Sequence, residues 1–336
     1  MSPRRVPLSI LDLSPASAGR TRADALHDTA ALAQAADRLG YRRYWVAEHH
    51  GSETFMSSAT SLILGHLAER TERIRLGSGG VMLPNHAPLM VAEYYGTLAT
   101  LYGDRFDLGL GRAPGTDPMT AAALRRGTGE LDTFVQDVLA LQGYLGDPPQ
   151  DGAPRVRAIP GEGTHVPLWM LGSSLGGASV AAYLGLPFVF ASHFAPQALT
   201  VALAHYRQHF DASAPTAQVD KPYVVAGANV LVAPTDEEAA LLSTTGQQLA
   251  WRIRTGQRGP LDPPRAGFLD ELPAPVRASI AEVQSVRAVG SPERVVADLE
   301  AFVAEHDLDE VITTTYTHDP ALRVRSYELL AQAWGL

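Results

Sequence analysis

The sequence predicts a (β/α)8 barrel of the TIM type, with insertions, that includes residues 1–336 in a single domain. Eight strand-like segments alternate with helical patterns along the whole chain, as they do in barrels of this kind. Several of these segments are continuous apolar runs, which is typical of strands buried on both faces. The length of 336 residues is common for one such barrel. An open, doubly wound sheet is the alternative.

The expected strands are short apolar segments spread from the amino to the carboxyl end. They cover residues 6–14, 43–48, 73–83, 105–111, 166–172, 187–192, 222–232 and 309–316. Helical patterns lie between them. Residues 23–39 place a stripe of apolar side chains on one face and end at Gly40, a residue type that commonly closes a helix. Thr235, with Glu238 three positions later, and Ser291, which precedes a proline, are expected to begin two further helices.

Two segments are too long and too rich in proline and glycine to be simple connections. They lie near residues 146–165 and 256–289. We expect each of them to form either a lid or wall of a substrate channel, or a surface loop without a function.

Composition and charge exclude several classes of protein. The 27 basic and 36 acidic residues give a net charge of −9, which does not suit a nucleic-acid-binding surface. The absence of cysteine excludes disulfides, thiolate catalysis and cysteine-based metal sites. The amino-terminal apolar run is too short for a signal peptide or a membrane span. We therefore expect a cytoplasmic protein that does not associate with membranes.

Five of the eleven histidines lie at or just beyond a predicted strand end: His49, His50, His86, His193 and His318. The carboxyl ends of the strands form the active-site face of a (β/α)8 barrel, so these side chains are expected to gather there. A metal site is one explanation. However, successive residues of a strand point to opposite faces, and the sequence contains no H-E-x-x-H pattern. We therefore predict no metal.

The segment "GSGGVMLPNHAP", residues 77–88, has glycines inside its predicted strand. Gly77, Gly79 and Gly80 contribute no side-chain packing, and such glycines mark a bulge or a place where a ligand approaches the backbone closely. A tight bend of the barrel is the structural alternative. Three glycines within four positions, in the carboxyl half of a strand, favour a flat ligand.

The segment "LGSSLGGAS", residues 171–179, combines a strand end, a hydroxyl-rich turn and the start of a helix. Its free N–H groups and the hydroxyls of Ser173 and Ser174 can bind an anion, assisted by the helix dipole. Arg112 follows the preceding strand and can add a bidentate contact to a phosphate. A capped turn without a ligand is the alternative. A phosphate beside glycines that accept a flat ring indicates a nucleotide-like cofactor, although neither GxGxxG nor a P-loop occurs in the right context.

These residues lie in segments that resemble the bacterial luciferase-like flavin monooxygenase family, over nearly the whole chain. The segments are "YRRYWVAEHH", "GSGGVMLPNHAPLMVAEYYGTL", "YGDRFDLGLGRAPGTD" and "LGSSLGGASVAAYLGLPFVFASHFAP", and they occur in the family's order. Within the family, the chain is most similar to the single-chain alkanal-monooxygenase-like branch. Four such segments in the right order are a specific signal.

The resemblance implies a barrel that binds reduced flavin mononucleotide (FMN). His49 matches the family's catalytic histidine, and Arg112 matches its phosphate-binding arginine. Gly79 and Gly80 match the pair whose cis peptide bond lies against the isoalloxazine ring. An imidazole with a pKa near neutrality suits proton donation or acceptance beside the flavin, and this would explain why the second strand delivers His49 to its carboxyl end.

Further residues complete the expected site. The turn expected to hold the phosphate contains Gly172, Ser173 and Ser174. The substrate pocket is expected to include Glu48, His86 and His193, with an apolar lining around Trp45, Phe55 and Phe194. Glu48 either orients His49 or pairs with a basic neighbour, and His50 is expected to be structural. Gly111 stands where the luciferases have a cysteine, so light emission is not implied.

The implied activity is that of a flavin-dependent monooxygenase, which uses reduced FMN and O2 to oxygenate a small organic substrate. No second nucleotide-binding domain is evident, so a separate flavin reductase is expected to supply the reduced flavin. A deazaflavin-dependent hydride-transfer enzyme and a flavin-binding protein without catalysis are the alternatives. The apolar helices "SATSLILGHLAER" and "APLMVAEYYGTLATLY" imply a homodimer, and burial against the barrel is the alternative for them.

Overall fold

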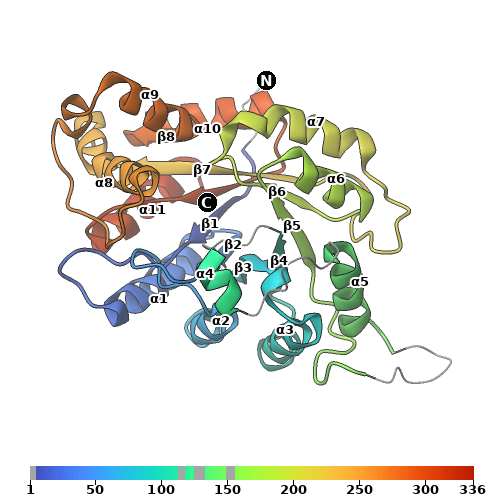
Figure 1. Ribbon diagram of the computed structural model, residues 1–336. Coiled ribbons are helices and arrows are strands. Elements are labelled where there is room, and N and C mark those ends of the chain that lie inside the picture. The colour runs from blue at the N-terminus through green and yellow to red at the C-terminus, as the bar shows by residue number, and fades with distance from the viewer. Residues whose placement is uncertain (1–4, 113–117, 125–132, 149–155) are drawn as a thin grey trace.

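The computed structural model describes residues 5–112, 118–124, 133–148 and 156–336. Its centre is a closed barrel of eight parallel strands, which confirms the predicted class (Figure 1). Around the barrel the order is β1-β2-β3-β4-β5-β6-β7-β9, and β9 pairs with β1. Each strand lies within its predicted segment: β1 (Leu8–Asp12), β2 (Arg43–Val46), β3 (Arg75–Met82), β4 (Phe106–Gly111), β5 (Leu168–Gly172), β6 (Phe188–Phe190), β7 (Val224–Val232) and β9 (Glu310–Thr314).

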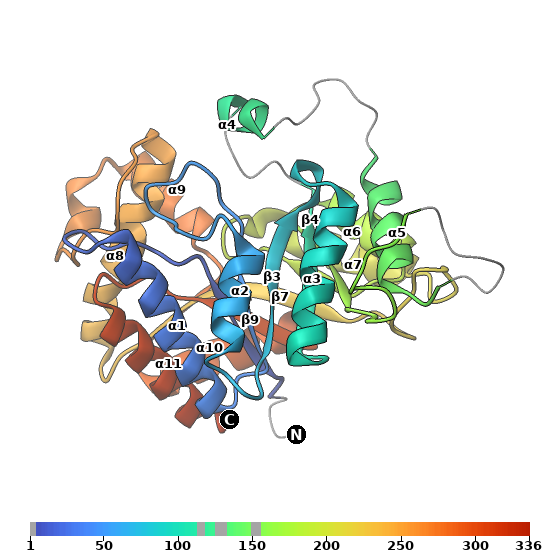
Figure 2. The same cartoon turned by 90° about the horizontal axis from the view of Figure 1, so that it is seen from below.

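Helices surround the barrel and cover the outer faces of its strands, while α4 lies beyond the carboxyl ends of β3 and β4 (Figure 2). The helices are α1 (Arg22–Leu39), α2 (Thr60–Ala68), α3 (Pro88–Tyr102), α4 (Pro118–Ala123), α5 (Phe134–Leu145), α6 (Leu175–Tyr183), α7 (Leu199–His209), α8 (Asp236–Thr255), α9 (Ala274–Val283), α10 (Pro292–His306) and α11 (Pro320–Trp334). Short 3-10 turns occur at η1 (Leu83–Asn85), η2 (Pro196–Ala198) and η3 (Phe268–Glu271). Within the described ranges, no helix combines the length and the apolarity needed to cross a lipid bilayer.

The segment 256–289, which the sequence suggested was irregular, contains regular structure. It includes η3, α9 and a further strand, β8 (Arg287–Gly290). The short β6 pairs only with the first three residues of β7, from Val224 to Ala226, so β7 extends past it. β8 pairs in parallel with the last four residues of β7, from Asn229 to Val232. The extra strand therefore satisfies backbone groups of β7 that would otherwise form an open edge.

The described part of the other insertion, residues 146–148 and 156–165, packs on the outside of the barrel. Gly161 crosses α3 so closely that a Cβ added to Gly96 would lie 2.1 Å from the Gly161 Cα. Ala158 is buried in the main core. This part of the segment therefore packs over α3. The remaining residues of the segment, 149–155, lie outside the described ranges, so the expectation of a lid there stays a prediction.

Two helix starts follow local capping rules, and a third departs from them. The Thr21 hydroxyl accepts a hydrogen bond from the Asp24 N–H at 3.1 Å, and the Asp24 carboxylate accepts one from the Thr21 N–H at 2.8 Å, so a capping box begins α1. Thr235 caps α8 with its hydroxyl, as expected. Ser291 precedes α10, but its hydroxyl makes no capping bond. Instead its backbone N–H donates to Asp236 at 2.7 Å, which ties the start of α10 to the start of α8.

The amino-terminal end of the barrel interior is filled by ion pairs and indole rings. Arg43 of β2 donates to Asp107 of β4 at 2.7 Å and to Glu310 of β9 at 3.0 Å, and none of these side chains is more than 7% exposed. The Arg43 guanidinium lies 4.2 Å from the centroid of the Trp169 ring. Trp169 in turn meets Trp45 edge to face at 5.4 Å. These contacts fill the amino-terminal end of the barrel interior. They leave the carboxyl end free to form a cavity.

Candidate active site

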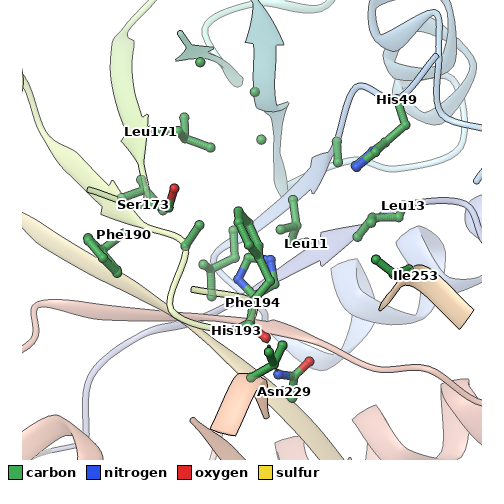
Figure 3. Close-up of a pocket in the computed structure, with 18 of the residues that line it drawn as sticks. Leu11, Leu13, His49, Leu171, Ser173, Phe190, His193, Phe194, Asn229 and Ile253 are labelled. Carbon is green, nitrogen blue, oxygen red and sulfur yellow. Dashed lines mark hydrogen bonds between the residues drawn. The ribbon is translucent and has the colours of Figure 1, made fainter. Parts of the chain in front are cut away.

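A cavity of about 990 Å³ lies at the carboxyl end of the barrel, and each of the eight barrel strands or the segment that directly follows it contributes to the lining. This volume is at the upper end of the range of about 300–1,000 Å³ that is usual for ligand pockets, so a cofactor can be held with room for a second molecule. The lining is mostly apolar, with Leu11, Leu13 and Leu171 on the barrel side and Ile253 and Phe194 near them (Figure 3).

The cavity brings together residues that the sequence placed at separate strand ends. Those that line it are Glu48, His49, Gly79, Gly80, Arg112, Gly172, Ser173, Ser174 and His193, together with the expected apolar residues Trp45, Phe55 and Phe194. In Figure 3 His49 and Ser173 lie on opposite sides of the pocket, with His193 and Phe194 between them. His86, which was expected in the pocket, is not among the lining residues. His318 also lies elsewhere and contacts the Ala18 carbonyl at 3.0 Å.

Glu48, directly after β2, holds two histidines. Its Oε1 lies 2.8 Å from Nε2 of His50 and 2.9 Å from Nε2 of His86, and its Oε2 accepts from the Met82 N–H at 3.1 Å. Burial raises the pKa of Glu48, but the hydrogen bonds and the charge of His86 outweigh it, so that the net pKa is lowered. Glu48 therefore pairs with basic neighbours instead of orienting His49, and it ties the end of β2 to the end of β3. His86 lies behind the pocket wall because its ring turns toward this carboxylate.

The same three side chains form the one group in the described ranges that could hold a metal ion. Their ligand atoms on Glu48, His50 and His86 all lie within 4.8 Å of one another. Hydrogen bonds of ordinary length already join both imidazoles to the carboxylate. The three side chains therefore form a hydrogen-bonded cluster.

His49 places its ring in the wall beside Phe55, with the ring centroids 5.1 Å apart. Its Nδ1 is buried and has no hydrogen-bond partner within the described chain. Burial lowers the pKa of His49 to about 4, and the negative charge of Glu48 offsets this only in part. At neutral pH the imidazole is therefore uncharged, and Nε2 is the nitrogen that is left to face the cavity.

β3 reaches the cavity as bare backbone at Gly79 and Gly80. A Cβ at Gly79 would lie 2.5 Å from Cδ1 of Leu11, and one at Gly80 would lie 2.8 Å from the carbonyl oxygen of Gly109. The pairing of β3 with β4 shifts register across this pair, so the strand contains the bulge that was one of the two meanings expected of these glycines. The peptide bond between the two glycines is cis. The wall here is a surface without side chains, against which a flat group can lie.

The turn from β5 into α6 offers hydrogen-bond donors at another part of the same cavity. Ser174 occupies the N-cap position of α6, but its hydroxyl makes no capping bond. Gly172 lets the turn close tightly, because a Cβ there would lie 3.1 Å from the Gly177 Cα. Arg112, at the end of β4, is exposed and lines the cavity as well. A helix start, two serine hydroxyls and a guanidinium together suit an anionic group such as a phosphate.

His193, after β6, is a second imidazole in the wall. Its Nδ1 is also buried without a partner in the described residues. Burial, with a smaller effect from His49, lowers the pKa of His193 to about 4. Two uncharged imidazoles therefore share one cavity at neutral pH.

One wall of the cavity was only partly foreseen. Leu249 and Ile253 of α8 and Ile280 and Val283 of α9 line it. The alternative of a channel wall in the segment 256–289 is therefore confirmed for α9. The place of α8 was missed, because an apolar stripe on a helix indicates that a face is buried and does not say what it faces.

The sequence pattern of the luciferase-like monooxygenase family matches residues 6–307. A protein of Escherichia coli (strain K12) named luciferase-like monooxygenase is 42% identical over 331 residues, which cover 98% of this chain and 97% of that protein. Both findings agree with the resemblance carried by the four sequence segments.

Solved structures share the fold along the whole chain. The structure of apo-MsnO8 superposes with a TM-score of 0.90 at 34% identity, over 99% of this chain and 98% of that one. The oxygenating constituent of 3,6-diketocamphane monooxygenase from Pseudomonas putida, in complex with FMN, gives a TM-score of 0.70 at 16% identity, over 98% of both chains. An F420-dependent secondary alcohol dehydrogenase gives 0.68 at 16% identity, over 98% of this chain and 99% of that one. At such low identity the last two show the fold alone.

The buried histidines predict acid sensitivity. Both His49 and His193 have a pKa of about 4 in the folded protein, against an ordinary value of 6.5 for histidine, so the unfolded chain binds more protons between these two pH values. The free energy of unfolding should therefore fall as the pH drops through this window, by up to about 3 kcal/mol for each group, and the contribution is fully present above it.

Urea unfolding at about pH 7 and about pH 4.5 measures this loss. His49→Gln and His193→Gln should each lose less stability between the two conditions than the parent protein. His27→Gln, at an exposed position, is the matched control and should lose as much as the parent. Equal losses in all four proteins would contradict the assignment of neutral buried imidazoles.

Proposed function

Because the chain belongs to the luciferase-like monooxygenase family, we propose that it is a flavin-dependent monooxygenase that uses reduced FMN and O2 to oxygenate a small organic substrate. The proposal depends above all on one observation. A single cavity joins a bare glycine surface on β3, donors for an anion after β4 and β5, and the uncharged imidazole of His49. A separate flavin reductase would supply the reduced cofactor.

The shape of the cavity fits FMN part by part. The backbone of Gly79 and Gly80 can accept a flat ring, since any side chain there would collide with Leu11 or with β4. The serine turn and Arg112 can hold the phosphate. When bound, reduced FMN would supply the reaction with O2 that delivers one oxygen atom to the substrate.

The protein's own groups would orient the reactants, exclude water and move a proton. The apolar wall that includes Leu13 and Ile253 excludes water from the space beside the glycine surface. His49 can accept or donate a proton at Nε2, because its Nδ1 is buried. The substrate is small and largely apolar, since the lining around Trp45, Phe55 and Phe194 offers few polar partners.

The charge of the lining supports FMN over a deazaflavin as the proposed cofactor. Deazaflavin tails are long and acidic, and a site for them would need several basic residues near the phosphate turn. Among the described lining residues the cationic side chains are Arg112 and Arg254. Arg254 lies on α8 and hydrogen-bonds to the hydroxyl of Ser279 on α9, which places it on the helical wall and not at the turn.

Oxidised FMN should bind, and Arg112→Ala should weaken that binding by about 10–100-fold, because a charge-assisted phosphate contact is worth about 1.5–3 kcal/mol. Riboflavin, which has no phosphate, should bind Arg112→Ala as well as it binds the parent. Arg254→Ala is the matched control and should leave FMN affinity within about twofold. Fluorescence titration measures all of these affinities.

A deazaflavin cofactor that binds the parent protein much more tightly than FMN does would contradict the choice of FMN and would instead support hydride transfer.

His49→Ala should slow oxygenation by about 10²–10⁴-fold, the usual contribution of a positioned acid or base. Affinity for FMN should stay close to that of the parent. The measurement mixes protein and photoreduced FMN with oxygenated buffer and a panel of small apolar substrates, and product is determined by mass spectrometry. His318→Gln, outside the cavity, is the control. Unchanged rates in His49→Ala would remove the proposed role, and no product from the parent would favour a flavin-binding protein without catalysis.

We also expect a homodimer formed through α2 and α3. These helices pack together and expose Leu62 by 75% and Leu101 by 66%, with Met90 and Tyr94 partly exposed beside them. Light scattering during size-exclusion chromatography should give twice the chain mass. The double variant Leu62→Glu and Leu101→Glu should give a monomer, whereas the control Val201→Glu on α7, also at an exposed apolar position, should not. A monomeric parent protein would contradict this arrangement.

A further inference from the structure

His193 is an imidazole in the cavity wall for which the proposed reaction has no use. It follows β6 and lies close to Phe194 and Asn229 in Figure 3. Its backbone carbonyl accepts a hydrogen bond from the Asn229 side chain at 2.6 Å, and its ring meets the Phe194 ring edge to face at 5.0 Å. The neighbouring Ser192 donates to the Gly227 carbonyl at 2.6 Å. The segment is therefore held to β7 at successive positions, with the imidazole packed against the Phe194 ring.

β7 is shaped to accept this ring. A Cβ at Gly227 would lie only 2.3 Å from Nδ1 of His193 and 3.2 Å from its Cε1. Any side chain at this position would displace the imidazole. The Nδ1 edge of the ring thus rests on the bare backbone of Gly227, and the opposite edge is directed away from β7.

The surroundings of the two ring nitrogens decide which one carries the proton. Nδ1 is buried and has no partner within the described residues. Nδ1 therefore stays without a partner in either tautomer. A proton on Nδ1 would have no acceptor, whereas a proton on Nε2 can be donated to water or to another molecule in the cavity, so the Nε2 tautomer is favoured. Nε2 also has no hydrogen bond to a described residue, but it is not fully buried, and His193 lines the cavity. In the uncharged ring the proton therefore belongs on Nε2, where it can be donated to a molecule in the cavity.

We propose that His193 binds the substrate directly, by donating a hydrogen bond from Nε2 to an uncharged acceptor oxygen such as a carbonyl. This inference rests on the proposed function, because it places the substrate in the room that the cofactor leaves in the same cavity. An uncharged donor in an apolar wall favours a neutral acceptor over a carboxylate, since a carboxylate would lose its hydration without gaining an opposite charge. The substrate class is therefore an apolar molecule that carries an uncharged acceptor oxygen.

The tautomer can be tested on the cofactor-free protein. Nitrogen-15 NMR of labelled histidine distinguishes a protonated from an unprotonated ring nitrogen, and the signal that disappears in His193→Gln identifies the residue. We expect the proton of His193 on Nε2 at neutral pH. A proton on Nδ1 would overturn the proposal. This measurement needs neither substrate nor turnover.

Recognition of a carbonyl can be tested with two probes of the same shape. Acetophenone has a carbonyl oxygen at the position where α-methylstyrene has a methylene group. The measured quantity is the ratio of the affinities for acetophenone and α-methylstyrene, divided by the ratio of their partition coefficients between water and an apolar solvent. With oxidised FMN at saturation, this corrected ratio should be about 3–10 for the parent, as one hydrogen bond would give. His193→Gln keeps an uncharged N–H donor and should keep the preference, whereas His193→Leu should lose it. Ligand-observed NMR measures both affinities.

Three further results would decide against the proposal or for it. An equal preference in His193→Leu and the parent would overturn it. A loss of FMN affinity of tenfold or more in His193→Leu, with the probe preference unchanged, would assign the donor to the flavin instead and would also overturn it. Loss of the preference in Gly227→Ala, which displaces the ring without removing it, would support it. If FMN fails to bind the parent, the proposed function fails, whereas the probe preference without FMN still tests His193.

Discussion

The ion pairs of Arg43 are the contact on which this barrel depends. Eight parallel strands enclose a space that must be filled at the amino end, because empty volume in a core is costly. Arg43 bridges Asp107 and Glu310 from strands on different sides of the barrel and stacks on Trp169. Removing one partner from such a buried network costs about 3–5 kcal/mol, since charges are left without compensation. With the lower part closed in this way, the carboxyl end can stay open for ligands.

The open end of the barrel separates charge from apolar surface. Glu48 is the acidic residue in the lining, and its two oxygens are occupied by His50, His86 and a backbone N–H. The guanidinium of Arg112 lies at the end of β4, near the serine turn expected to hold a phosphate. Between them the wall is apolar, and the imidazoles of His49 and His193 are uncharged there because burial disfavours the imidazolium form. Such a site can hold a charged tail at one end and an uncharged reaction centre at the other.

Glycines make this arrangement possible at two places. At one, the backbone of β3 lies close to that of β4, and at the other, the backbone of β7 lies close to the His193 ring. At Gly79 and Gly80 the third strand offers its peptide groups to the cavity, and at Gly227 the seventh strand gives way to the ring of His193. A side chain at Gly79 or Gly80 would collide with Leu11 or with the backbone of β4, and one at Gly227 would occupy the space of the imidazole. The two glycine positions lie on different strands, yet they shape one cavity.

Local sequence determined the eight barrel strands, the helix start at Thr235 and the glycine bulge of β3, because continuous apolar runs, capping residues and glycine clusters are properties of neighbouring residues. It also placed His49, Arg112 and the serine turn at strand ends, and the barrel rule put them on one face. Only the tertiary structure decided that β8 extends the sheet, that α8 forms part of the cavity wall, and that His86 turns toward Glu48. These features depend on contacts between residues far apart in the chain, such as the 38 positions from Glu48 to His86. A residue pattern states that a face is buried or a group is polar, whereas the partner is chosen by the packing of the whole fold.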